Sequence, residues 1–360
     1  LRSAYSAALA ILLLLLFLAP YIAGSFLRPQ HADLVPKYTQ AAFSATVYAA
    51  LGLLFATRNI PKRVFFIGWV VIFTATIPVI FDMAARGFGS TTRVAEAALH
   101  ITLGDIFVFS TLMALSKCDS LKEKALLFFL GVVALTAIGS RTSLYCFIAA
   151  LPVIILFGTR RVQKIALAPS ALVLMVLLFP IIFQLSLELG LDRARMFSFL
   201  FNSRGDTAWE GRVLALNAGL VDIKDNPLLG SFGSDLDRFG QGGMYIHNYL
   251  ELWRQLGLLP FSLFTFLLLW AASACIGAGS HAGRRAIFVL SLFIAPLTTA
   301  IIFSRSYGYP QIFFVLGLAA VFIHKIQRRE KSNPGEFSVS DGARFPHSNV
   351  RGRARRLRPL

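Results

Sequence analysis

Long apolar runs, separated by short polar segments, occupy most of the chain outside one polar stretch in its second half. We expect helices near residues 6–27, 38–57, 64–81, 99–116, 125–139, 142–157, 165–185, 256–276, 286–303 and 309–325. A helix needs roughly 20 apolar residues to cross a hydrocarbon core of about 30 Å. Lipid offers no partner for backbone groups, which favours helices over open strands. The pattern predicts an all-α, polytopic membrane protein with about ten transmembrane helices.

The composition agrees with this class of protein. Of 360 residues, 56% are hydrophobic and 15% are charged, and the mean hydropathy is +0.67. Soluble globular domains average about 25% charged residues, so an ordinary soluble domain is excluded. The first apolar run follows Arg2 and is longer than that of a usual signal peptide, without a clear cleavage motif. We therefore expect a retained helix.

The net charge of +17 is explained by topology and does not require a nucleic-acid partner. Many arginines lie in residues 326–360, after the last apolar run. We expect this segment to be a disordered tail that either contacts anionic lipid headgroups or stays solvated. Most other basic residues lie in short loops between apolar runs, where they determine orientation.

Alternate loops differ in their content of lysine and arginine. The loops at 58–63, 117–124, 160–164 and 284–285 are richer in basic residues than the loops between them. Because basic loops remain in the cytoplasm, we expect both termini inside and residues 186–255 outside. We interpret 1–325, including this large loop, as one domain and 326–360 as a cytoplasmic tail.

The large loop mixes acidic and basic residues, as a folded surface in water does. Apolar residues at helical spacing predict an amphipathic helix over 207–224 that can lie along the membrane surface. They are Trp209, Val213, Leu216, Leu220 and Ile223. Asn226 and Pro227 end this helix, and a glycine-bearing stretch follows. Another helix is expected to open at 245–248 and to break near 257–260.

Two arginines and one histidine are the main candidates for chemistry on the outer side. Arg141 lies in a Gly-Ser-Arg-Thr-Ser turn, Arg212 near the start of the amphipathic helix, and His247 at the opening of the next one. Their ordinary interpretations are a headgroup contact, a surface ion pair and a structural histidine. In the functional interpretation the guanidinium groups bind a diphosphate and the imidazole accepts a proton.

Other candidates are weaker. Glu251, four residues after His247, and Asn248, directly after it, are candidates to orient the imidazole. Asp105 is an ionisable group within an apolar run and therefore a functional candidate, although no partner is evident from the sequence. No residues have the spacing of a metal site, and the glycine-bearing stretch has no phosphate-loop pattern. We expect neither a metal nor a cofactor.

Three features together resemble the O-antigen ligase and O-antigen polymerase superfamily of bacterial membrane glycosyltransferases. The first is the Ser140-Arg141-Thr142 turn. The second is Gly211-Arg212 with its helix, the Asn-Pro-Leu-Leu-Gly sequence at 226–230 and a glycine-bearing loop. The third is His-Asn-Tyr-Leu at 247–250 followed by Gln-Leu-Gly-Leu at 255–258. The resemblance covers roughly residues 125–275, and its strength lies in the order and spacing of the three features.

The resemblance implies a metal-independent, inverting glycosyltransferase with a GT-C-type architecture in the bacterial inner membrane. Its donor would be an oligosaccharide on undecaprenyl diphosphate, and its acceptor a glycan or a lipid-linked sugar at the periplasmic face. Arg141 and Arg212 would bind the diphosphate, and His247 would be the base or a further diphosphate contact. The short chain and compact loop depart from the family and leave polymerase and ligase both open.

Two other classes compete with this interpretation. A transporter or flippase for a polar lipid or polysaccharide would move substrate without covalent chemistry. It predicts internal repeats and several ionisable groups at membrane depth, of which the sequence offers Asp105 alone. A structural partner in an envelope biosynthesis complex is the third interpretation.

Overall fold

The computed structural model describes residues 2–27, 34–85, 94–158, 207–240, 246, 248–281, 284–303, 305 and 309–332, and within them the chain is all-helical. The helices are α1 Arg2–Leu27, α2 Leu34–Thr57, α3 Lys62–Ala85, α4 Val94–Lys117, α5 Leu121–Ile138, α6 Arg141–Ile148, α7 Ala150–Gly158, α10 Thr207–Asp225, α11 Ser234–Phe239, α12 Leu250–Leu256, α13 Leu258–His281, α14 Arg284–Phe303 and α15 Gln311–Ser332.

The helices expected within these residues are present, with two differences. The helix expected to open at 245–248 begins at Leu250, as α12. The run at 142–157 forms two helices, α6 and α7, interrupted at Ala149. Pro152 gives the physical reason, because it has no N–H to donate to the carbonyl of Ile148 one turn earlier. The helix expected near 165–185 and most of the tail at 326–360 lie outside the described residues.

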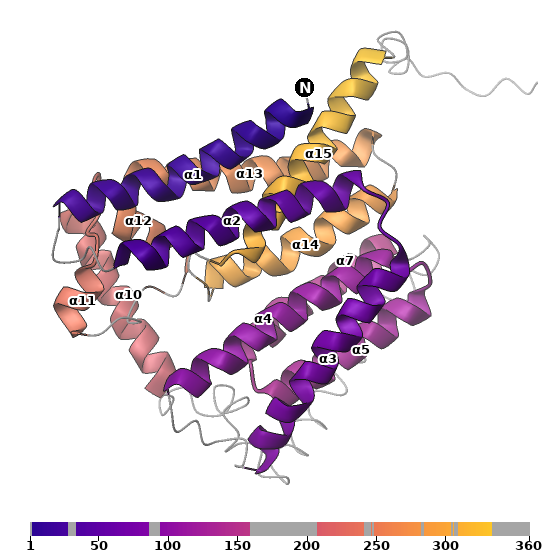
Figure 1. Ribbon diagram of the computed structural model, residues 1–360, viewed down its shortest axis with the longest axis horizontal. Coiled ribbons are helices and arrows are strands. Elements are labelled where there is room, and N and C mark those ends of the chain that lie inside the picture. Colours follow the sequence, from indigo (N-terminus) through magenta and orange to yellow (C-terminus); the bar gives the residue numbers. More distant parts are fainter. Residues whose placement is uncertain are drawn as a thin grey trace, which may run out of the picture.

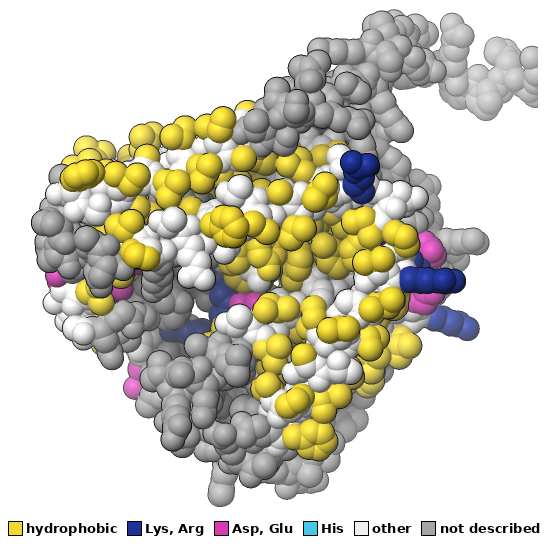
Figure 2. All heavy atoms as spheres, viewed as in Figure 1, with side chains coloured by type: hydrophobic (Ala, Val, Ile, Leu, Met, Phe, Trp, Pro, Cys, Tyr) yellow, Lys and Arg dark blue, Asp and Glu magenta, His cyan; other side chains and the backbone are white. Residues whose placement is uncertain are grey.

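Three of the described helices are long and apolar enough to cross a membrane. Their apolar segments are Ala8–Phe26, Leu34–Thr57 and Lys62–Phe81, and four shorter apolar helices accompany them at Thr142–Leu156, Leu258–Ser273, Ile287–Ile302 and Gln311–Phe322. Large apolar side chains such as Phe43, Ile67 and Phe81 are exposed, and Figure 2 shows apolar side chains over much of the visible face. Such extensive apolar surface is typical of contact with lipid or protein.

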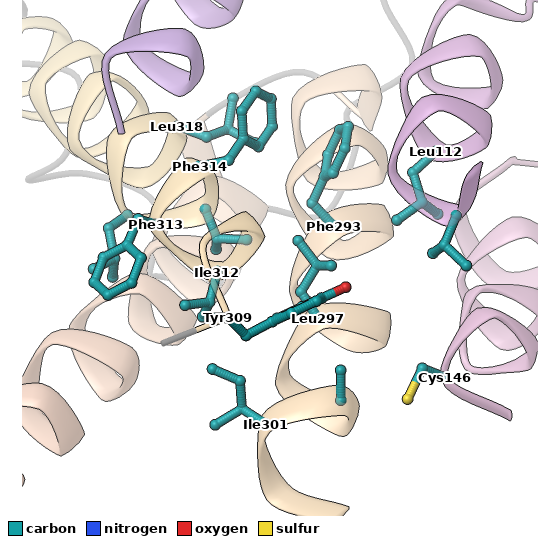
Figure 3. Close-up of a cluster of buried hydrophobic side chains, with 14 of the residues drawn as sticks. Leu112, Cys146, Phe293, Leu297, Ile301, Tyr309, Ile312, Phe313, Phe314 and Leu318 are labelled. Atoms are coloured by element: carbon teal, nitrogen blue, oxygen red, sulfur yellow. The ribbon is translucent and has the colours of Figure 1, made fainter. Parts of the chain in front are cut away.

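The helices form two groups joined by α14 (Figure 1). One group contains α1, α2, α13 and α15, and the other contains α3, α4, α5, α6 and α7. Helix α14 packs against α15 and α13 on one side and against α4, α6 and α7 on the other. Figure 3 shows its residues Phe293 and Leu297 between Phe314 of α15 and Leu112 of α4. The core is therefore continuous through α14.

Helices α2 and α15 approach each other at two glycines. A Cβ atom on Gly52 would collide with the carbonyl oxygen of Phe314, and one on Gly317 with that of Ala49. Small residues allow helix backbones to come this close, a common way for helices to associate in membranes. This contact holds the first two helices against the last.

Basic residues mark one end of the bundle, which we call the basic end. Here α2 and α4 finish and α3 and α5 begin. Lys62 Nζ lies 2.9 Å from both carboxylate oxygens of Glu123, and Ser120 caps α5 by accepting a hydrogen bond from the Glu123 N–H at 3.1 Å. We call the opposite end, where α5, α1 and α14 finish and α10 to α12 lie, the site end (Figure 1).

Candidate functional site

The turn between α5 and α6 places Arg141 at the site end. Gly139 ends α5 with a φ of 74°, a left-handed conformation that glycine adopts without steric cost. Its N–H donates to the carbonyl of Thr136. Ser140 precedes α6, and Arg141 is the first residue of that helix. The tight turn expected from the sequence is confirmed, while the side chain of Arg141 lies outside the described residues.

An ion pair joins this turn to the segment between α14 and α15. Arg305 Nε donates to Asp105 Oδ2 at 2.9 Å, and Arg305 Nη2 donates to Asp105 Oδ1 at 3.0 Å. Both side chains are 12% exposed. Two parallel N–H···O bonds between a guanidinium and a carboxylate fix distance and orientation together. The sequence identified Asp105 as an ionisable group at membrane depth, and the structure gives it Arg305 as a partner.

Two serines extend the pair to the residue before Arg141. Ser143 Oγ donates to Asp105 Oδ1 at 2.6 Å, and the hydroxyls of Ser140 and Ser143 lie 2.7 Å apart. Gly104 makes this approach possible, because a Cβ there would collide with the side chains of both serines. We call Asp105, Ser140, Ser143 and Arg305 the Asp105 cluster.

The Asp105 cluster lies inside the bundle, far from the basic end of α4. Asp105 lies 12 residues before Lys117, the last residue of α4, which corresponds to about 18 Å along a helix. A carboxylate so far from the basic end and largely buried requires a charged partner. Figure 2 shows a depression between the two groups of helices, with acidic and basic side chains inside it.

A second buried network surrounds Arg254 of α12, which is 1% exposed. Its guanidinium nitrogens lie 2.7 Å from Glu251, 3.5 Å from Asp235 and 3.7 Å from Asp222. Arg238 of α11 adds a contact of 2.5 Å to Asp222. Since these acids come from α10, α11 and α12, the network fastens the three helices into one unit. We call it the Arg254 network.

Both carboxylate oxygens of Glu251 accept hydrogen bonds within this network. Its Oε1 accepts from Arg254 at 2.7 Å and from Gln255 at 2.9 Å, and its Oε2 accepts from the backbone N–H of Ile246 at 2.8 Å. Burial raises the pKa of the Glu251 carboxyl above its ordinary value, although Arg254 and Gln255 favour the charged form. Glu251 thus anchors the backbone of the residue immediately before His247.

The segment that carries His247 is also attached to α14. His247 itself lies outside the described residues, but the N–H of Tyr249 donates to the carbonyl of Ile301 at 3.0 Å. Asn248 Oδ1 accepts from the N–H of Leu250 at 2.9 Å and so supports the start of α12. The N–H of Arg305 donates to the carbonyl of Ala300 at 2.7 Å. The final turn of α14 therefore accepts backbone hydrogen bonds both from Arg305 and from Tyr249, two residues after His247.

Arg212 lies on α10, the helix expected from the spacing of apolar residues. The helix is present with the bounds Thr207–Asp225, but the predicted apolar stripe divides between two environments. Ile223 is buried, whereas Val213 is 39% and Leu220 is 46% exposed. The buried side of α10 contains Gly219, on which Ile246 packs. Arg212 itself is partly exposed and has an interacting partner.

The described contacts link two of the three predicted site elements. The Arg141 turn reaches Arg305 through the serines, and Tyr249, two residues after His247, is bonded to the turn of α14 that also accepts from Arg305. The helix that carries Arg212, α10, packs against α12. Among the described residues no group of His, Cys, Asp and Glu is suited to hold a metal ion.

Sequence reasoning missed the roles of Arg305 and Arg254. Arg305 is a lone cation in a short loop, and only its position between two apolar runs signals that it is unusual. Arg254 lies three residues after Glu251, a spacing that places both on one face of a helix. That spacing could have predicted the ion pair between Glu251 and Arg254.

Comparisons of the chain with protein-family models, with curated proteins and with solved structures find no match.

Proposed function

We propose that this chain is a membrane glycosyltransferase of the O-antigen polymerase or ligase type. It acts at the outer face of the bacterial inner membrane, crosses the membrane about ten times and keeps both termini in the cytoplasm. The donor is an oligosaccharide on undecaprenyl diphosphate, and the acceptor is a sugar hydroxyl of a glycan or of a lipid-linked sugar. The compact loop favours the polymerase.

One observation supports this proposal most: the Asp105 cluster, which contains the residue before Arg141, and Tyr249, two residues after His247, are both bonded to the last turn of α14. Arg141 follows a serine of the Asp105 cluster, and Tyr249 is bonded to Ile301 of α14. A diphosphate leaving group requires concentrated positive charge, and arginines supply it without a metal. A base beside such a site can activate the incoming hydroxyl.

The proposed reaction is a single displacement. His247 takes the proton of the acceptor hydroxyl while that oxygen attacks the anomeric carbon of the donor. The bond from this carbon to the diphosphate oxygen breaks, the electron pair leaves with undecaprenyl diphosphate, and the configuration inverts. Arg141 and Arg212 stabilise the charge on the departing diphosphate. No metal or redox partner takes part.

The test uses purified protein with a labelled undecaprenyl-diphosphate oligosaccharide and follows release of the lipid diphosphate. General bases contribute about 10²- to 10⁴-fold to rate, so His247→Ala is expected to lower turnover by at least about 100-fold. Lys62→Met, which breaks an ion pair at the basic end, is the control and should retain turnover. Full activity of His247→Ala would remove the proposed base.

The Asp105–Arg305 pair also favours a second candidate, a transporter or flippase for a polar lipid. Ionisable pairs inside a helix bundle often mark a substrate pathway. Reconstituted vesicles distinguish the two functions. Movement of the labelled lipid between leaflets without any change in its covalent structure would support transport, whereas elongated or transferred glycan supports the glycosyltransferase.

A further inference from the structure

We infer that the turn at residues 227–229, together with the first residues of α13, is a lipid anchor that enters the outer leaflet of the membrane. This turn, Pro-Leu-Leu, lies between the end of α10 and the start of α11, and we call it the leucine turn. Its partner is the apolar region just below the lipid headgroups. The inference rests on the membrane arrangement proposed above and not on the reaction.

The leucine turn presents large apolar side chains at the surface. Leu228 is 69% exposed and Leu229 is 76% exposed. Leu259, the second residue of α13, is 78% exposed. Single exposed leucines are common on proteins, whereas a group of them at one place is typical of an interaction surface.

Backbone contacts hold the leucine turn against the junction of α12 and α13. The N–H of Leu258 donates to the carbonyl of Leu228 at 3.2 Å, and Trp253 Nε1 donates to the carbonyl of Pro227 at 2.8 Å. A Cβ atom on Gly257 would collide with the same Leu228 carbonyl, so the two backbones approach as closely as a glycine allows. The exposed leucines of the turn and of α13 are therefore neighbours in a fixed arrangement.

The exposed apolar surface continues from the leucine turn along α13. Leu259, Phe266 and Leu269 are all exposed, and their spacing of seven and three residues places them on one side of the helix. The chain from 257 to 280 contains no charged residue and no histidine, and Leu258–Ser273 is an apolar helical segment. Under the proposed arrangement this stripe faces lipid, and the leucine turn extends it at the site end.

Aromatic side chains beside the leucine turn are typical of the boundary between lipid and water. Phe261 stacks on Trp253 with ring centroids 4.9 Å apart and on Tyr249 with centroids 5.3 Å apart. Tryptophan and tyrosine are enriched at membrane interfaces, because each combines an apolar ring with a polar group. These rings place the junction of α12 and α13 at the level of the headgroups, with the leucine turn next to it.

Lipid fits this surface better than a second copy of the chain. The stripe on α13 offers a protein partner no charged group, and such groups usually determine which partner binds. A lipid anchor also has a structural consequence. Because the Arg254 network fastens α10, α11 and α12 together, an anchor between α10 and α11 would hold the whole unit at the membrane surface (Figure 1).

The experiment measures the depth of the leucine turn with a fluorescent label. Leu229→Cys, with the native cysteines replaced, is labelled with NBD and reconstituted into phosphatidylcholine vesicles, with or without a lipid that carries a nitroxide close to its headgroup. An anchored turn would lie about 5–10 Å into the leaflet, so the nitroxide should quench this label at least about twofold more strongly than a label at Asp225→Cys. Iodide in the water should have the opposite preference. Asp225 is the control because it is an exposed acidic residue four positions earlier.

Two charge variants of the labelled protein form a matched pair. Leu228→Asp introduces a carboxylate into the anchor and should lower quenching by the nitroxide lipid about twofold or more, because a carboxylate is costly to transfer out of water. Asn226→Asp adds the same charge at an exposed position two residues earlier and should leave quenching unchanged. Melting temperatures show whether both variants fold. The comparison of Leu229→Cys with Asp225→Cys decides even if one of them does not.

A label at Phe266→Cys, within the stripe on α13, separates this inference from the membrane arrangement. Lipid quenching at both Phe266 and Leu229 supports the anchor. Lipid quenching at Phe266 with only iodide quenching at Leu229 overturns the anchor alone, and no lipid quenching at either position overturns the arrangement and the anchor together. Cross-linking between two Leu229→Cys chains, with the label protected from both quenchers, would assign the surface to a second copy and refute the lipid anchor. None of these measurements needs a donor or an acceptor, so a failure of the proposed reaction is distinguished from a failure of the anchor.

Discussion

At the scale of single residues, the main feature is that buried charges occur in networks with several partners. Arg254 contacts three carboxylates while being 1% exposed, and Gln255 joins them by donating to Glu251 and Asp235. Removing one partner of a buried network leaves the others unpaired in a poorly solvated site. Stability at the site end should therefore depend strongly on single charged side chains.

Arg254→Met is expected to destabilise the protein by about 3–5 kcal/mol, the usual cost of breaking a buried ion pair. Methionine fills similar space but leaves Glu251 and Asp235 without the guanidinium. The measurement is unfolding in detergent, followed by temperature or denaturant. Arg238→Met is the matched control in the same network, and it should cost less because Arg238 is 41% exposed. Equal losses in the two variants would contradict this assignment.

Glu251 is expected to make stability depend on pH. Burial raises its pKa in the folded state above the ordinary value of 4.5. A raised pKa means that the folded state favours the protonated carboxyl, so this contribution is complete below the unfolded pKa and is lost as pH rises through the folded pKa. Relative to Glu251→Gln, the unchanged protein should lose stability as pH rises above about 4.5. Parallel melting curves of the two proteins against pH would exclude the effect.

At the scale of helices, close backbone packing at glycines determines how α2 meets α15. Gly317→Ala places a methyl group against the carbonyl oxygen of Ala49, and we expect a loss of about 1–3 kcal/mol from overpacking. Gly68 on α3 is the control, since nothing lies within 4 Å of a Cβ there. Gly68→Ala should be neutral or stabilising by up to about 1 kcal/mol, because alanine favours helix. Unfolding measurements that show the same sign for both would contradict the proposed contact.

The sequence predicted most of the helices because an apolar run of sufficient length has few alternatives in lipid. It did not predict α11, because the glycines in the stretch from Gly233 to Gly240 are typical of a loop. In the structure, these two glycines flank a helix of six residues. It also placed a helix start at 245–248, whereas α12 begins at Leu250. Short helices like these are stabilised by tertiary contacts, which a local pattern does not contain.

The candidate site was less predictable than the helices. Asp105 and Arg305 are 200 residues apart, and their pairing depends on how α4 packs against α14. Arg141 was predicted at a turn because Gly139 and Ser140 end one apolar run and open another. The contacts of Glu251 with the backbone of Ile246 could not be read from side-chain spacing, since the chain folds back over five residues to make them.

At the scale of the whole molecule, the two ends of the bundle differ in charge and in structure. The basic end has short turns with exposed basic residues, among them Arg58, Arg63 and Lys122, and the site end has buried ion networks and the α10 to α12 unit. Under the proposed function, the basic end faces the cytoplasm and the site end faces the periplasm. Under that proposal, the residues that set the orientation and the residues that carry the chemistry lie at opposite ends of the bundle.

Single cysteines test this orientation. With the native cysteines replaced, Asn226→Cys at the site end should react with a membrane-impermeant maleimide in spheroplasts. Ser120→Cys at the basic end should react only after lysis. Both positions lie in exposed turns, so accessibility within the fold does not separate them. Reaction of Ser120→Cys in spheroplasts, with Asn226→Cys protected, would reverse the orientation.

Pro296 gives the end of α14 a particular mechanical property. It lies within the helix and has no N–H to bond the carbonyl of Leu292, so the helix is weakest one turn before Ile301. Bending there would move Ala300 and Ile301 together. The backbone groups of Arg305 and Tyr249, which donate hydrogen bonds to these two residues, would move with them. Under the proposed function, a tilt at Pro296 would displace the backbones of Tyr249 and Arg305 together and would tie release of the lipid carrier to opening of the site.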